Sequence, residues 1–312
     1  MLDRSVPGGP SKPMIRLFPV FLLCACAAGP TPAAIWTRDM ATAVREQDQL
    51  AQLQLWRERH QAAEGWDPVA LVGLARTLRR TGQPEVAARV LSAGDLRLEG
   101  ASGSVALELA RTEQVLGRQE QALLILERVV VCADRPRGAW LELARAQLRA
   151  GQVARAVKAA TSAVREQPHR VDALDLLVLC AAQGNDPLIE YDALVRRMGL
   201  GGMDVLHLIR LAELAHSLGD QRPRGLEREI SALERAIERD PQCARAHRML
   251  GNIALSTQDH GRALVYFERA AELDPGNQAL LFEYANCLDT VGQEERARQT
   301  REHARRLPNS DE

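Results

Sequence analysis

Apolar residues recur at helical spacing along most of the chain, in units that repeat about every 34 residues. Each unit contains two segments whose apolar residues return every three or four positions, and in most units a glycine separates the two segments. The units begin at Pro68, Gly103, Arg137, about Val171, Val205, Ala244 and Gln278. The glycines at the turns are Gly82, Gly117, Gly151, Gly184, Gly219 and Gly292. The pattern predicts pairs of amphipathic helices joined by tight turns.

Small residues recur at three fixed places, numbered 8, 20 and 27 from the start of each unit. They are Ala75, Ala110, Ala144, Ala87, Ala122, Ala156, Ala263, Ala297, Ala163, Ala270 and Ala304. Alanine at these places lets two helix backbones approach closely, while larger residues such as Leu74 and Leu250 fill the layer between them. Because no single pair can bury both of its faces, we expect an all-α fold in which the pairs stack into a solenoid.

Two units carry a more specific pattern. The unit 244–277 holds Leu250, Gly251, Ala263, Phe267, Ala270 and Pro275 at positions 7, 8, 20, 24, 27 and 32. The unit 137–170 holds Trp140, Leu143, Ala144, Gly151, Ala156, Ala163 and Pro168 at equivalent places. These residues resemble the tetratricopeptide repeat. The resemblance covers residues 68–308 as about seven units, and it implies a right-handed α-solenoid whose concave groove binds a peptide or a partner helix.

The predicted array is least regular over residues 171–243. Pro187 closely follows the turn, and residues 199–202 contain glycines that end the second helix of that unit early. In the next unit Glu229 stands where other units have alanine.

Both flanks of the array have their own pattern. Residues 33–65 predict one or two capping helices with apolar residues that include Trp36 and Trp56. At the other end residues 296–306 are strongly polar, which is typical of a solvated cap, and residues 309–312 form a short tail.

The composition excludes several classes of function. Aromatic residues make up only 4% of the chain, which disfavours a large sheet. Of the 40 basic residues only Lys12 and Lys158 are lysines, and neither lies in a G-x-x-x-x-G-K-[ST] phosphate-binding loop. The formal net charge of −1 gives no general attraction to nucleic acid.

Motifs of enzymes and metal sites are also missing from the sequence. No histidine begins H-E-x-x-H, there is no G-x-S-x-G, and no C-x-x-C occurs beyond the N-terminal region. We therefore expect a protein that is not an enzyme, with no catalytic residue, cofactor, metal, nucleic-acid partner or small-molecule substrate. Cysteines 132, 180, 243 and 287 lie in or beside predicted helices, where we expect buried small apolar side chains rather than disulfides.

The resemblance places position 9 of each unit in the concave groove. This position reads Arg76, Arg111, Arg145, Val178, Glu213, Asn252 and Asn286 along the array. Arg79, Arg80 and Arg149 lie close to the first three of these residues. Since a guanidinium group binds a carboxylate through two hydrogen bonds, one interpretation is that the N-terminal half binds an acidic segment or a C-terminal carboxylate.

A second interpretation is that these arginines pair along their own helices. Glu108 lies three residues before Arg111, and Glu142 lies three before Arg145, so each pair shares one helix face. Arg76 has Gly73 at the corresponding place and is expected to lack such a partner.

Further along, Arg248 and Asn252 resemble part of the carboxylate clamp of chaperone-binding tetratricopeptide domains. Where that clamp has an asparagine in the next unit, this chain has Glu283. The difference argues against a receptor for chaperone tails.

The N-terminal region resembles a bacterial lipoprotein signal. A short basic stretch ends at Arg16, residues 17–23 form an apolar run, and small residues follow. The run is too short to cross a bilayer as a helix. Residues 23–26, Leu-Cys-Ala-Cys, resemble a lipobox, which implies that residues 1–25 are cleaved, that Cys26 carries the lipid, and that residues 26–32 form a tether.

Ala27 follows this cysteine, which for a lipoprotein implies the outer membrane, with the array facing the periplasm. The alternatives are a soluble periplasmic protein and an uncleaved cytosolic one. We expect a scaffold or adaptor that binds proteins or peptides in cell-envelope assembly, similar to the lipoproteins that assist secretin assembly in type IV pilus biogenesis. Alternative functions are a regulatory or substrate-delivering subunit of a cell-envelope enzyme, and a soluble adaptor if the signal is not used.

Overall fold

The structure, a computed structural model, describes residues 39–44, 48–63, 67–97, 102–219 and 224–307. All regular elements in these ranges are helices, which confirms the predicted all-α fold. After a short helical stretch at 39–44, the helices are α2 (Gln49–Ala62), α3 (Pro68–Arg80), α4 (Pro84–Arg97), α5 (Gly103–Val115), α6 (Gln119–Val129), α7 (Ala139–Arg149), α8 (Val153–Glu166) and α9 (Val171–Gln183). They continue as α10 (Pro187–Gly199), α11 (Val205–Leu218), α12 (Gly225–Arg239), α13 (Ala244–Ser256), α14 (His260–Leu273), α15 (Gln278–Thr290) and α16 (Glu294–Arg306). The predicted signal, Cys26, the tether, residues 33–38 of the capping region and the tail lie outside the described residues.

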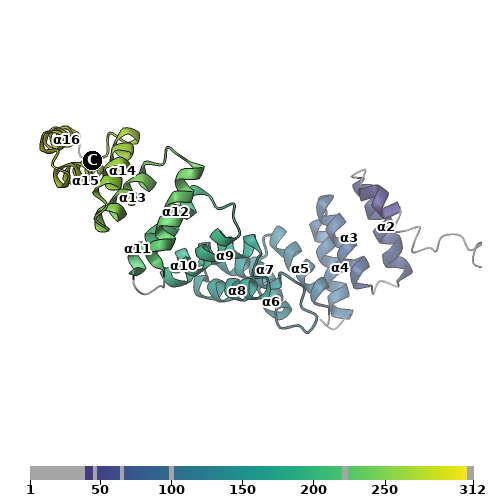
Figure 1. Cartoon of the computed structure of the whole chain (residues 1–312). Helices are drawn as coiled ribbons and strands as arrows, with labels where there is room; N and C mark the ends of the chain where they lie inside the picture. Colours follow the sequence, from purple (N-terminus) through teal and green to yellow (C-terminus); the bar gives the residue numbers. More distant parts are fainter. Residues whose placement is uncertain (1–38, 45–47, 64–66, 98–101, 220–223, 308–312) are drawn as a thin grey trace, which may run out of the picture.

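The helices from α3 to α16 form seven consecutive pairs that follow one another in an elongated row (Figure 1). Within each pair the two helices pack against each other, and the second helix also packs against the first helix of the next pair. The first helices start at the residues where the sequence units start, apart from α7, which starts at Ala139 rather than Arg137. Gly138 takes a left-handed backbone conformation with φ of 86° and delays that start.

The turns inside the pairs need one residue with positive φ. Glycine supplies it at Gly82, with φ of 77°, and at Gly117, Gly151 and Gly292. Between α9 and α10, however, Gly184 has a helical φ of −79° and Asn185 takes the left-handed conformation instead. Asparagine tolerates this conformation better than most residues, so the turn is kept without glycine.

The core consists of the small and large apolar residues that the repeat pattern identifies. The alanines predicted at positions 8, 20 and 27 are at most 4% exposed. The ring of Phe267 lies so close to Gly251 that an added Cβ atom would meet it at 3.0 Å. Cys180 and Cys287 are buried free thiols, and burial raises the pKa of Cys180 to about 11.

Backbone irregularities gather in the stretch where the sequence pattern weakens. Gly201, Gly202 and Arg224 all have positive φ, and Glu229 of α12 is buried. The packing nevertheless continues through this stretch, because one cluster of buried residues extends from Ala106 to Ile253.

The two ends of the row are closed differently. At the N-terminal end α2 lays the indole of Trp56 directly against Gly73 of α3. At the C-terminal end α16 is polar and buries only Ala297 and Ala304. No helix among the described residues is both long enough and apolar enough to cross a membrane.

Candidate functional site

The first helices of the pairs line one side of the solenoid. Helix α3 contacts α5, and α7 contacts α9, although a second helix separates each of these pairs in the sequence. This close spacing makes the side of the first helices the inner side of the stack. We call it the first-helix face, and it carries the arginines that the sequence singles out.

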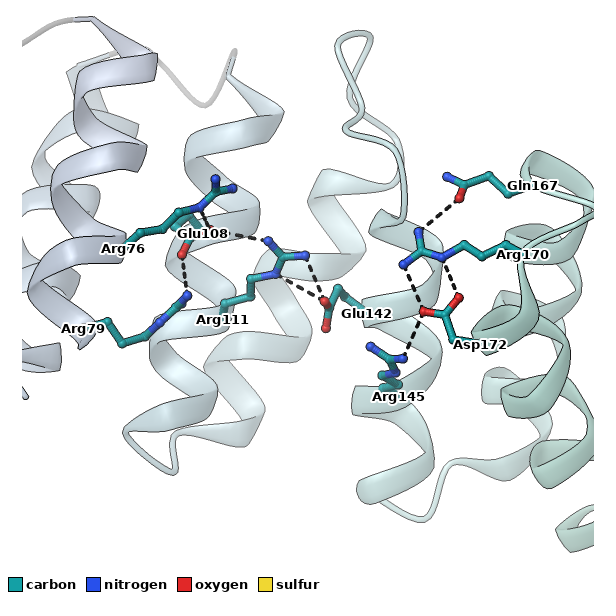
Figure 2. A network of polar contacts seen from close by, with 9 residues as sticks. All are labelled: Arg76, Arg79, Glu108, Arg111, Glu142, Arg145, Gln167, Arg170 and Asp172. Atoms are coloured by element: carbon teal, nitrogen blue, oxygen red, sulfur yellow. Dashed lines mark hydrogen bonds and ion pairs between the residues drawn. The ribbon is translucent and has the colours of Figure 1, made fainter. Parts of the chain in front are cut away.

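Glu108 of α5 is the most buried charged residue on this face (Figure 2). Its Oε2 accepts a hydrogen bond from Nε of Arg76 at 3.0 Å. Arg79 lies 2.7 Å from the other carboxylate oxygen, and Nη1 of Arg111 lies 3.5 Å from Oε2. Three guanidinium groups from two units therefore compensate one buried carboxylate, which is the arrangement that a buried charge requires.

The same kind of pair recurs at the next two junctions (Figure 2). Arg111 donates to Glu142 of α7 from Nη2 at 2.9 Å and from Nε at 3.2 Å. Arg145 of α7 lies 3.4 Å from Asp172 of α9. Asp172 also accepts hydrogen bonds from Arg170, at 2.6 and 3.0 Å, and these bonds hold the pKa of its carboxyl below the usual value.

These contacts correct the expectation that the arginines pair along their own helices. Only Arg111 keeps such a contact, the 3.5 Å approach to Glu108, while Arg145 reaches the next unit instead of Glu142. Arg76 has no acidic partner on its own helix, as expected, but Glu108 of the following unit supplies one. The partners come from the neighbouring unit because stacking brings the first helices together.

Two of the predicted groove arginines differ from the others. Arg80 and Arg149 are exposed, and no ion pair joins either of them to another residue in the described ranges. Their guanidinium groups therefore remain available to a ligand.

Val178, predicted at position 9 of the α9 unit, does not lie on the first-helix face. Val178 is only 5% exposed and belongs to the core, whereas its neighbour Leu179 is 48% exposed. Counted from the observed start of α9 at Val171, Leu179 is the residue at position 9.

The remaining units carry different side chains at this position. Glu213 of α11 forms an ion pair with Arg245 of α13. Asn252 donates to Glu283 of α15 at 3.3 Å. Asn286 accepts a hydrogen bond from Arg301 of its own pair at 3.1 Å.

Glu283 fills the place that resembles a carboxylate clamp. Arg248 donates to its two oxygens at 2.7 and 2.5 Å, and these bonds raise the pKa of Arg248. With Asn252 bonded to the same carboxylate, the chain's own side chain occupies the donors that a ligand carboxylate would need.

Comparison with known proteins identifies the repeats. Residues 141–187 and 230–299 match the tetratricopeptide repeat family. These two stretches are tetratricopeptide repeats. No curated protein sequence matches the chain.

Several solved structures resemble it at low identity. The chain is 14% identical to a tetratricopeptide repeat protein from Parabacteroides merdae, with 87% of this chain and 98% of that one covered and a TM-score of 0.46. It is 14% identical to YrrB, a TPR protein described as having an unusual peptide-binding site, with 56% and 88% covered and a TM-score of 0.47. It is 18% identical to Pseudomonas aeruginosa pilF, with 56% and 78% covered and a TM-score of 0.40.

Tetratricopeptide repeat proteins act as scaffolds for protein–protein interaction, through the extended surface that their stacked units form. In this chain the first helices of the first three helix pairs have an uneven charge. Helices α3, α5 and α7 together carry six arginines against three glutamates. No group of histidine, cysteine, aspartate and glutamate side chains in the described residues could hold a metal ion. What this face can do chemically is bind anionic groups.

Proposed function

We propose that this protein is a lipid-anchored scaffold of the cell envelope that binds an acidic segment of a partner protein on the first-helix face of α3, α5 and α7. The observation that carries the proposal is the excess of six arginines over three glutamates on these helices. Every glutamate is already paired: Glu108 and Glu142 bond the groove arginines, and Glu113 bonds Arg118. Of the six arginines, Arg145 pairs with Asp172, while Arg80 and Arg149 have no ion pair with the described residues, and their positive charge favours an anionic ligand.

The donors for such a ligand are in place. Arg76 is half-exposed and uses Nε for Glu108, which leaves its two Nη groups without a hydrogen bond to the described residues. Arg80 and Arg149 are exposed on the same helices. A carboxylate that approaches this face meets donors already held by the Glu108 cluster, so less side-chain freedom is lost on binding.

The anchor in this proposal is the lipid on Cys26. It rests on the lipobox resemblance of residues 23–26 and on the tether of residues 26–32. A lipid there holds the array at the periplasmic face of the outer membrane. The setting that we propose is the assembly of an envelope complex such as the type IV pilus secretin.

Binding is tested with a fluorescent peptide of about ten alternating aspartates and glutamates. We expect Arg80→Glu/Arg149→Glu to weaken its affinity at least about tenfold, because the change removes two unpaired cations and adds two anions. The matched control is Arg89→Glu/Arg165→Glu, which makes the same charge change at exposed positions on the second helices α4 and α8. Equal loss in both double variants would show that only net charge matters and would contradict a site on the first-helix face.

The anchor is tested by intact mass and membrane fractionation of the wild type beside Cys26→Ser. We expect the wild type to be cleaved before residue 26, to gain the mass of acyl chains and to sediment with the outer membrane, and the variant to lose all three. An unprocessed wild-type chain in the cytosol would refute the anchor. Co-purification with a cell-wall enzyme instead of a pore subunit would refute the proposed setting.

A further inference from the structure

At three junctions the residue at position 9 forms an ion pair with the first helix of the next unit, at one of two places. Arg76 and Arg111 reach position 6 of the following first helix, at Glu108 and Glu142. Arg145 reaches position 2, at Asp172, with the two residues 27 apart in sequence. Position 9 of one unit and position 2 or 6 of the next are therefore the places to compare at the other junctions.

At the junction of α9 and α11 the equivalent pair is apolar. Leu179 holds position 9 of α9 and Leu206 holds position 2 of α11, and they are separated by the same 27 residues as Arg145 and Asp172. Leu179 is 48% exposed and Leu206 is 80% exposed. A single exposed leucine is ordinary, but here two exposed leucines hold the repeat positions at which α7 and α9 form an ion pair.

The apolar pair also marks the place where the polarity of the contacts reverses. Before it, position 9 is basic and the next unit supplies the acid, as in Arg145 with Asp172. After it, Glu213 holds position 9 and Arg245 at position 2 of the next unit supplies the base.

The nearby carboxylate of Asp175 is bonded to Arg197 at 2.8 Å, so it does not repel an acidic ligand with its full charge.

From this arrangement we infer that Leu179 and Leu206 form a docking point for one apolar side chain of the acidic partner segment. The inference rests on the proposed function, since the acidic part of the segment lies over α3, α5 and α7. Charge complementarity fixes the order: the acids face the arginines, and the apolar residue follows where the arginines end. The partner is thus an acidic stretch with a leucine, isoleucine, methionine or phenylalanine beyond one of its ends.

The experiment compares four fluorescent peptides, each with an acidic block of about ten residues. Two peptides carry a leucine three residues away from the block, one on its N-terminal side and one on its C-terminal side. The other two carry serine at the same places. For the wild type we expect the leucine peptide to bind about tenfold more tightly in one of the two orders, because a leucine side chain leaves water. Leu179→Gln/Leu206→Gln removes this preference and leaves the affinity for the serine peptide unchanged.

The matched control is Leu124→Gln/Leu226→Gln, which changes leucines of 68% and 48% exposure on the second helices α6 and α12. This control keeps the leucine preference. If the wild type binds the leucine and serine peptides equally, or if the first-helix variant keeps the preference, the apolar docking point is refuted while the acidic site stands. If none of the peptides binds the wild type, the proposed function falls, and the inference with it.

Discussion

Glu108 shows how a single residue shapes the binding face. Its carboxylate is fully buried, yet it lies within 3.5 Å of three guanidinium groups. A buried charge is tolerated only when such partners compensate it, and here the partners outnumber it. The cluster therefore fixes the positions of Arg76, Arg79 and Arg111 and still leaves positive charge toward solvent. One buried acid thus holds three guanidinium groups together, and the cluster as a whole stays positively charged.

Glu229 of α12 is a buried acid with much weaker compensation. Its partner is His216 of α11, whose Nδ1 lies 3.3 Å away and whose side chain is 76% exposed. Five other units have a fully buried alanine at the same repeat position. Burial raises the pKa of Glu229, and the contact with His216 opposes that shift only in part.

This environment gives a pH-dependent stability. The raised pKa means that the folded state binds the Glu229 proton more tightly than the unfolded state does. The unfolding free energy therefore falls as the pH rises, starting at the pKa of glutamate in the unfolded chain and continuing through the higher pKa in the folded chain. We expect Glu229→Gln to lose this dependence and to raise the thermal midpoint by a few degrees at pH 8, with little difference at pH 4. Thermal melts followed by circular dichroism at several pH values measure the effect.

The control for this prediction is Glu227→Gln, an exposed glutamate of the same helix. Its melting curves follow those of the wild type at every pH. A Glu229→Gln protein whose midpoint differs from the wild type by the same amount at pH 4 and pH 8 would contradict the assigned role of burial.

At the scale of the helices, the contact between α2 and α3 depends on a missing side chain. The indole of Trp56 lies so close to Gly73 that an added Cβ atom would sit 2.3 Å from the ring. We expect Gly73→Ala to push α2 away and to destabilise this end by about 1–3 kcal/mol, as overpacking does. Hydrogen exchange read by mass spectrometry should show lost protection in α2 and α3 and unchanged protection from α7 onward.

Gly261→Ala serves as the comparison. This glycine lies in the first turn of α14, where an added Cβ atom comes no closer than 3.8 Å to a neighbouring atom. It should leave protection intact and raise stability slightly, because alanine favours the helix. Unchanged exchange in α2 after Gly73→Ala would mean that the indole does not rest on this residue.

The helices could be predicted from the sequence because their signals are local. Gly82 marks a turn by its own backbone freedom, and Ala144 marks a close contact within one unit. The partners of the groove arginines could not be predicted in this way, since Arg76 and Glu108 are 32 residues apart and meet only through stacking. The exchange of Val178 for Leu179 has a different cause, a count that was one residue short from the start at about Val171. One residue turns the side chain by about 100° around a helix, here from the face into the core.

At the scale of the whole molecule, the two ends of the row depend on their caps. Most of the buried residues form one cluster from Ala106 to Ile253, while a separate cluster from Ala254 to Ala297 serves the last units. In a stack of repeats each unit is stabilised mainly by its neighbours, so an end unit has half the support of an inner one. Helix α16 supplies that support for α15 although it buries only two alanines itself.

Removal of residues 294–312 tests this dependence. It uncovers Leu288 and Tyr284 of α15, which are 0% and 7% exposed, and it removes the hydrogen bond from Arg296 to the Tyr284 hydroxyl at 2.9 Å. We expect α15 to lose nearly all of its hydrogen-exchange protection, and α14 to lose part of it, because Phe267 shares the same cluster. Helices α5 to α11 should keep theirs, since their cluster does not include α15. A chain that ends after Leu307 is the control and should exchange like the full chain. If protection fell evenly from α3 to α15 instead, the array would unfold as one cooperative unit and the caps would stabilise all of it.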